Sequence, residues 1–152
     1  MQTLMTLIVV WLSINFGAPR DFDHPRIAFA TPTELAEGRL GQTMPPSRTV
    51  GETDNPELSA APEVYAYYND ASRTIYLPAG WSAASPKDVS ILVHELVHHL
   101  QNAEGAKFGC PQEREKDAYR AQRAWLQLFD LSLEQEFELD GLTLLVRTNC
   151  MG

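Results

Sequence analysis

Residues 93–100 of the chain read VHELVHHL, an apolar stretch that contains the pattern His-Glu-x-x-His. On a helix, residues four apart point the same way, so His94 and His98 can hold one zinc ion between their imidazoles. Glu95 follows the first of these residues and can lie beside the ion without binding it. A general base at that place can take a proton from water. The stretch therefore predicts a zinc site that has its own base.

The residues around this motif predict a buried helix. Ser85 and Pro86 are typical of a helix start, Asp88 suits the first turn, and residues 89–101 contain no Gly or Pro. Apart from the motif, the segment is almost wholly apolar, and a buried imidazole or carboxylate needs a partner. A metal ion would be that partner. The alternative is a core helix whose histidines are hydrogen-bonded.

Length and composition indicate one globular domain. The 152 residues include 44% hydrophobic and 21% charged residues, which suits one core and is too little for two domains. The net charge of −8 argues against nucleic acid and anionic lipid as partners. We expect residues 21–152 to form the domain. Residues 1–20 are expected to be a signal peptide or an N-terminal anchor, because residues 4–16 are almost continuously apolar but short for a membrane span.

The two cysteines agree with export to the periplasm or the cell exterior, where the N-terminal segment can also anchor the protein to the membrane. In an exported chain an even number of cysteines favours a disulfide, here between Cys110 and Cys150. This bond would tie the segment after the motif helix to the C-terminus. The alternative role, Cys110 as a metal ligand, requires a thiolate and leaves Cys150 unpaired.

The segment before the motif predicts a small sheet. Residues 64–68 and 73–77 are rich in aromatic and β-branched residues and have turn residues between them, so we expect an antiparallel hairpin. Residues 26–30 are a candidate short strand. A helix should start at residues 31–35 and end soon, at Gly38 or Gly41.

Residues 42–62 contain four prolines and few large apolar residues. We expect an exposed loop, either one that borders a substrate cleft or a mobile insertion.

A second long helix is expected after the motif. Pro111 suits its first position, and residues 112–130 lack Gly and Pro and carry apolar residues at helical spacing. Residues 131–137 continue this pattern. Asp140 is a suitable cap for a last helix over residues 141–147, whose apolar residues should pack on the core: Leu142, Leu144, Leu145 and Val146.

Two histidines do not hold zinc tightly, and a catalytic zinc site usually has three protein ligands and one open position. No histidine follows His99, so the metzincin pattern with a third histidine is excluded. A carboxylate from the second helix is the natural third ligand. Glu115 lies near the inward stripe of that helix, whereas Glu113 and Asp117 lie further round and are the fallback ligands.

With this third carboxylate, the sequence resembles the gluzincins, zinc metallopeptidases in which the helix after the motif helix donates a Glu. In several of them that Glu precedes an Ala by three residues, as Glu115 precedes Ala118 here. The resemblance covers roughly residues 64–128, and the sequence looks like the compact minigluzincins and like small exported bacterial proteins of unknown function. It implies an α+β, zincin-like fold: a small antiparallel hairpin packed on the motif helix, then the ligand helix and C-terminal helices. The sequence departs from the family at Tyr119, where an acidic residue is usual. It also lacks the second lobe of the large gluzincins.

The expected function is zinc-dependent hydrolysis of peptide bonds in a peptide or protein substrate. Zn²⁺ held by His94, His98 and Glu115 would activate water, with Glu95 as the general base. A further donor to the reacting carbonyl can come from Tyr119 or His99, and the sequence does not choose between them. One alternative is a non-catalytic zinc-binding protein with a structural or interaction role. The other is a peptidase kept latent by the loop at residues 42–62.

Overall fold

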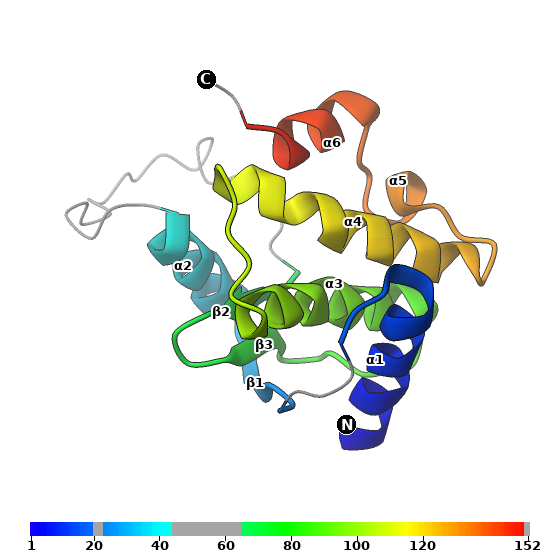
Figure 1. The fold of residues 1–152 in the computed structure, drawn as a ribbon, viewed down its shortest axis with the longest axis horizontal. Coiled ribbons are helices and arrows are strands. Elements are labelled where there is room, and N and C mark those ends of the chain that lie inside the picture. The colour runs from blue at the N-terminus through cyan, green and yellow to red at the C-terminus, as the bar shows by residue number, and fades with distance from the viewer. Residues whose placement is uncertain (20–22, 44–64, 151–152) are drawn as a thin grey trace.

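The computed structural model describes residues 1–19, 23–43 and 65–150, with side chains outside residues 39–43. The helices and strands follow in the order α1 (Gln2–Phe16), β1 (Arg26–Ala30), α2 (Pro32–Thr43), β2 (Tyr67–Asn69), β3 (Thr74–Pro78), α3 (Pro86–Ala103), α4 (Pro111–Gln127), α5 (Leu133–Glu136) and α6 (Gly141–Thr148). Helix α3 lies between the sheet and α4 (Figure 1). This arrangement confirms the predicted α+β fold.

The sheet has the strand order β1-β3-β2. Strands β2 and β3 form the predicted antiparallel hairpin, in which Tyr67 pairs with Tyr76. The predicted strand at residues 26–30 is also present, and it pairs with β3 in parallel. The sheet is therefore mixed rather than purely antiparallel, because a long connection that includes α2 separates β1 from β3, as parallel pairing requires.

Helix α2 begins with a capping box. Oγ1 of Thr31 accepts from the Glu34 N–H at 3.2 Å, and Oε2 of Glu34 accepts from the Thr31 N–H at 2.9 Å. The expectation that glycine would end this helix early was wrong, since it continues to Thr43. The ring of Tyr67 lies so close to Gly38 that a Cβ atom there would clash with it. This close packing offsets the weak helix propensity of glycine. Residues 42 and 43 of the expected loop belong to α2, and the rest of that loop, residues 44–62, lies outside the described residues.

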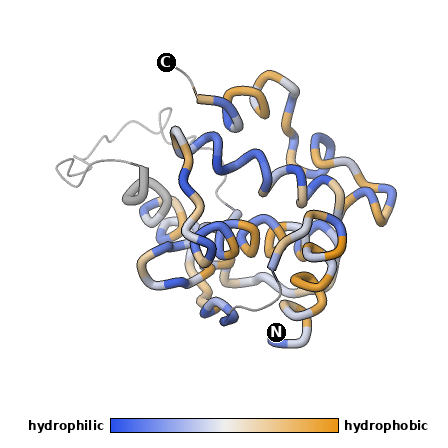
Figure 2. The backbone as a smooth tube through the Cα atoms, viewed as in Figure 1, coloured by the Kyte–Doolittle hydropathy of each residue, from blue (hydrophilic) through white to orange (hydrophobic). Residues whose placement is uncertain are grey.

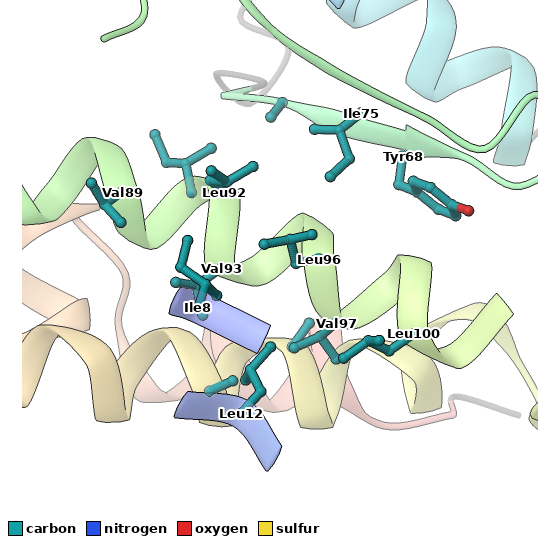
Figure 3. Close-up of a cluster of buried hydrophobic side chains, with 14 of the residues drawn as sticks. Ile8, Leu12, Tyr68, Ile75, Val89, Leu92, Val93, Leu96, Val97 and Leu100 are labelled. Carbon is teal, nitrogen blue, oxygen red and sulfur yellow. The ribbon is translucent and has the colours of Figure 1, made fainter. Parts of the chain in front are cut away.

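Helix α3 is the centre of the core. Ser85 caps it by accepting from the Asp88 N–H at 3.1 Å, as predicted, and residues 89–101 are all buried. Figure 3 shows Leu96 directed toward Ile75 of the sheet, whereas Val93 faces the opposite way, toward α1. Because much of the surface of α3 is covered by apolar neighbours, its motif histidines His94 and His98 turn toward α4.

Helix α1 is formed by the apolar segment that was predicted to be a signal peptide or anchor. Its Ile8 and Leu12 are buried and pack against α3 (Figure 3). Trp11 contacts Trp125 of α4 edge to face, with ring centroids 5.3 Å apart. None of the helices in the described part of the chain is long and apolar enough to cross a membrane. Whether residues 1–20 act as a signal peptide or an anchor stays a prediction.

The predicted helix over residues 131–137 was only partly right. Helix α4 ends at Gln127, Asp130 has a positive φ of 57°, and Ser132 then caps the short α5. Asp is one of the few residues that adopt this conformation readily, which explains the break. The predicted last helix is present as α6, with Asp140 accepting from the Thr143 N–H.

The apolar residues of α6 do not all pack on the core as expected. Leu144 is buried, whereas Leu142, Leu145 and Val146 are exposed. Hydrophobic segments of α6 are visible on the outside of the molecule in Figure 2, while the first turns of α4 are hydrophilic. Helix α6 makes its main contact with α4, so one stripe of its residues suffices for the packing.

Candidate metal centre

Three side chains predicted as ligands meet between α3 and α4. Helix α3 presents His94 and His98, one turn apart, and α4 presents Glu115. Oε2 of Glu115 lies 2.8 Å from Nε2 of His94 and 3.3 Å from Nε2 of His98. The three side chains are 8%, 7% and 19% exposed, and their ligand atoms all lie within 4.8 Å of one another. This cluster can hold a metal ion.

A glutamine on α4 orients the His94 ring. Oε1 of Gln122 lies 2.8 Å from Nδ1 of His94, and Nε2 of Gln122 donates to Oγ of Ser90 at 3.3 Å. The Ser90 hydroxyl donates its own proton to the backbone oxygen of Lys87, so it must accept from Gln122. The amide oxygen therefore faces His94, which makes Nδ1 the protonated nitrogen and leaves the lone pair of Nε2 directed into the cluster.

A second glutamine does the same for His98. Oε1 of Gln101 lies 2.9 Å from Nδ1 of His98, and Nε2 of Gln101 donates to the backbone oxygen of Arg114 at 3.0 Å. A carbonyl oxygen only accepts, so the orientation of this amide is again determined. Both imidazoles thus direct an unprotonated Nε2 toward the carboxylate of Glu115.

Two nitrogen lone pairs and a carboxylate oxygen at such distances require a positive charge between them. Without a metal, a proton must supply it. Burial lowers the pKa of His98, but the carboxylates of Glu115 and Glu95 outweigh burial and raise this pKa above its ordinary value. Burial raises the pKa of Glu115, but both histidines outweigh it, so the pKa is held well below its ordinary value. Two imidazole nitrogens and one carboxylate oxygen are a donor set that zinc takes in catalytic sites. The residues present therefore fit this ion.

Glu95 lies next to the cluster at the wall of a pocket. Its side chain has no hydrogen-bond partner in the part of the chain that the structure describes, although the residue is only 4% exposed. The pocket has a volume of about 480 Å³ and also borders His98 and Glu115. Aromatic and proline side chains form much of the remaining wall, namely Tyr67, Tyr68, Phe108 and Pro111. The carboxylate is thus available to a molecule in the pocket.

The fallback ligands lie elsewhere. Oε2 of Glu113 accepts from the Gly109 N–H at 2.7 Å and closes the loop before α4. Asp117 is exposed and does not belong to the cluster.

The two candidate donors differ in position. His99 points to the other side of α3, where Nε2 donates to the backbone oxygen of Asp23 at 2.7 Å and Nδ1 accepts from the Tyr68 hydroxyl at 2.8 Å. The ring of Tyr119 instead meets the ring of His94 edge to face, with centroids 4.7 Å apart, and Arg147 donates to its hydroxyl. Only Tyr119 therefore borders the cluster.

Sequence reasoning missed the residues that support the cluster. Gln101 follows His98 by three residues, and Gln122 follows Glu115 by seven, so each lies on the same helix face as a ligand. A glutamine on a buried face next to a histidine is a signal that could have revealed both. The ion pair between Arg114 and Asp70 spans 44 residues and has no local signal.

The disulfide between Cys110 and Cys150 is present, with the two Cα atoms 5.8 Å apart. It joins the residue before α4 to the end of the chain, as predicted. Cys110 is therefore not available as a metal ligand. A disulfide of this kind suits an oxidising compartment.

Together these features define a compact α+β protein with a buried His-His-Glu cluster able to hold a metal ion. The chain belongs to the family described as a domain of unknown function, DUF6647, whose model matches residues 1–152. The comparisons with curated proteins and with solved structures gave no match. The family description names no activity, so any functional conclusion depends on the site itself.

Proposed function

We propose that the protein is a zinc-dependent metallopeptidase. In this proposal His94, His98 and Glu115 hold Zn²⁺, and Glu95 is the general base. The observation that carries the proposal is the position of Glu95: its carboxylate borders the pocket beside the cluster and has no partner within the described residues. A site that only holds a metal needs ligands but no free carboxylate next to them.

The bound zinc would polarise the substrate carbonyl and lower the pKa of a water molecule toward about 7. Glu95 would accept a proton from a water molecule in the pocket while the water oxygen attacks the peptide carbonyl carbon. Glu95 then donates this proton to the amine nitrogen as the carbon–nitrogen bond breaks. Meanwhile Gln101 and Gln122 hold the two imidazoles through their Nδ1 atoms, so the ligands need not reorient during the reaction.

Two further features support a peptide as the substrate. The cluster has three protein ligands and opens to a pocket, whereas structural zinc sites are normally closed by four ligands. Among the described strands, β2 lies at the edge of the sheet, and its Tyr67 and Tyr68 line the same pocket. An extended peptide can pair with such an edge by strand addition. The net charge of −8 makes a nucleic acid an unsuitable substrate.

The experiment combines metal analysis with a broad peptide-cleavage screen on the purified, zinc-loaded chain. We expect one zinc per chain in the wild-type protein and in Glu95→Gln, and none in Glu115→Ala. Asp117→Ala is the matched control, because this exposed carboxylate lies on the same helix and should leave the zinc in place. Cleavage should be present in the wild type and absent in Glu95→Gln.

The two parts of the proposal can fail separately. A wild-type chain without zinc would contradict the metal centre. A chain that holds zinc through Glu115 but cleaves no peptide would contradict the peptidase and favour a zinc-binding structural or interaction protein.

A further inference from the structure

Arg114 lies directly before Glu115 on α4, and its guanidinium contacts three residues in two other parts of the molecule. Nη1 and Nη2 donate to the two carboxylate oxygens of Asp70, at 2.7 and 2.6 Å. Nη2 also donates to the backbone oxygen of His98 at 3.2 Å, and Nε donates to Oε1 of Gln101 at 3.3 Å. One side chain therefore joins α4, the C-terminal half of α3 and the turn between β2 and β3.

Arg114 also determines how the Gln101 amide is oriented. The backbone oxygen of Arg114 accepts from Nε2 of this amide, and Nε of Arg114 donates to its Oε1. The same Oε1 accepts from Nδ1 of His98. A flipped amide would place its NH₂ group against two donors and its oxygen against a carbonyl. Arg114 thus favours the orientation that leaves Nε2 of His98 free to bind a metal.

The two histidines are supported in different ways. The partner of His94, Gln122, bonds to Ser90, so that support stays within α3 and α4. The support of His98 continues through Arg114 to Asp70, which is 49% exposed. Asp70 and Arg114 also line the pocket that Glu95 borders. Part of the pocket wall and the residues that support His98 therefore belong to one hydrogen-bond network.

We infer that Arg114 is a positioning residue of the metal centre, which ties the ligand His98 to the β2–β3 turn and makes zinc affinity depend on Asp70. This inference rests on the proposed zinc site. Asp70 does not belong to the cluster, and Arg114 acts on His98 only through Gln101 and the backbone. The role needs the planar guanidinium, because the three N–H groups of a lysine ammonium leave a single nitrogen and cannot replace bonds that Arg114 makes from three separate nitrogens.

The test measures zinc affinity of the metal-stripped chain by competition with a chromophoric chelator, together with thermal unfolding of the metal-free form. Arg114→Ala should bind zinc about tenfold more weakly than the wild type, as is usual when a residue that orients a ligand is lost. Arg114→Lys should not restore the affinity. Asp70→Asn should lower it by a smaller factor. Arg123→Ala is the matched control, because Arg123 is on the same helix and pairs with Glu134 away from the cluster. It should leave zinc affinity unchanged.

A double variant separates positioning from a general loss of stability. Gln101→Ala should weaken zinc binding, and Arg114→Ala combined with Gln101→Ala should weaken it by clearly less than the product of the two single effects, because both changes break the same path through Gln101 to His98. If the effects instead multiply, the inference is wrong.

The remaining outcomes are equally decisive. Zinc affinity at the wild-type level in Arg114→Ala, or a loss as large in Arg123→Ala, would overturn the inference while leaving the metal centre intact. If Arg114→Ala does not fold, Asp70→Asn decides, and unchanged affinity in that variant overturns the inference. A wild-type chain that binds no zinc would instead refute the proposed function.

Discussion

Oε1 of Gln122 lies 2.8 Å from Nδ1 of His94, and this contact leaves the opposite ring nitrogen unprotonated and directed at Glu115. We therefore predict that Gln122→Ala binds zinc about 10- to 100-fold more weakly than the wild type. Gln122→Glu should keep most of the affinity, because a carboxylate also accepts from Nδ1. Chelator competition measures both variants.

Gln127 is the control for this prediction. It is the last residue of α4 and is exposed, so Gln127→Ala should bind zinc like the wild type. Equal zinc affinity in Gln122→Ala and Gln127→Ala would show that the His94 ring does not depend on its amide partner.

Zinc affinity should also depend on pH. In the metal-free protein, burial lowers the pKa of His98, but Glu115 outweighs burial and raises it above the ordinary value of 6.5. Below this raised pKa, zinc must displace a proton from His98. The apparent affinity should then fall about tenfold for each pH unit, with about one proton released per zinc bound. Competition titrations at several pH values measure the slope, and an affinity independent of pH between about 8 and 6 would contradict the prediction.

The metal-free protein should show the opposite trend in stability. A raised His98 pKa contributes stability that is present below 6.5 and is lost as the pH rises through the folded-state pKa. The lowered Glu115 pKa contributes stability that is present above its ordinary value of 4.5 and is lost only in strong acid. We expect thermal unfolding of the metal-free chain to occur at a higher temperature at about pH 6 than at about pH 8.5. Zinc should remove this difference.

Local signals predicted much of the fold. Ser85 and Asp140 are helix caps whose hydrogen bonds form as the sequence indicated, since a cap depends on residues within one turn. Features that depend on distant neighbours were predicted less well. Gly38 does not end α2, because the ring of Tyr67, from a strand far along the chain, packs against it. The outward direction of Leu142 likewise depends on α6 packing mainly on one other helix, α4.

The same distinction applies to the site. The spacing of His94 and His98 places them on one helix face, and the helical phase of Glu115 directs it inward, so all three could be predicted from periodicity. Arg114 could not be placed, because its role depends on Asp70 across 44 residues of sequence. A sequence pattern gives the ligands of such a site more readily than the residues that orient them.

The disulfide should contribute strongly to stability. It links residues separated by 40 positions, which corresponds to about 4 kcal/mol in the chain-entropy model. We predict that the double change Cys110→Ser and Cys150→Ser lowers the free energy of unfolding by roughly this amount, measured by urea denaturation of the metal-free chain. Reduction of the wild-type protein should have the same effect. Equal stability of the oxidised and reduced chains would contradict the prediction.

His99 should behave differently from its neighbour His98, although both lie in the motif helix. Its ring bonds to the Tyr68 hydroxyl and to the backbone oxygen of Asp23, so it joins the sheet and the segment before β1 to α3. His99→Leu leaves both partners without the ring, and we expect it to destabilise the chain by about 2–4 kcal/mol. It should keep one zinc per chain, whereas His98→Leu should lose it. His24→Ala is the control that should change neither property, because its hydrogen bonds to Gln2 and Thr6 are exposed. Unfolding experiments combined with metal analysis distinguish these three histidines. Loss of zinc without loss of stability in His99→Leu would place His99 in the metal centre instead.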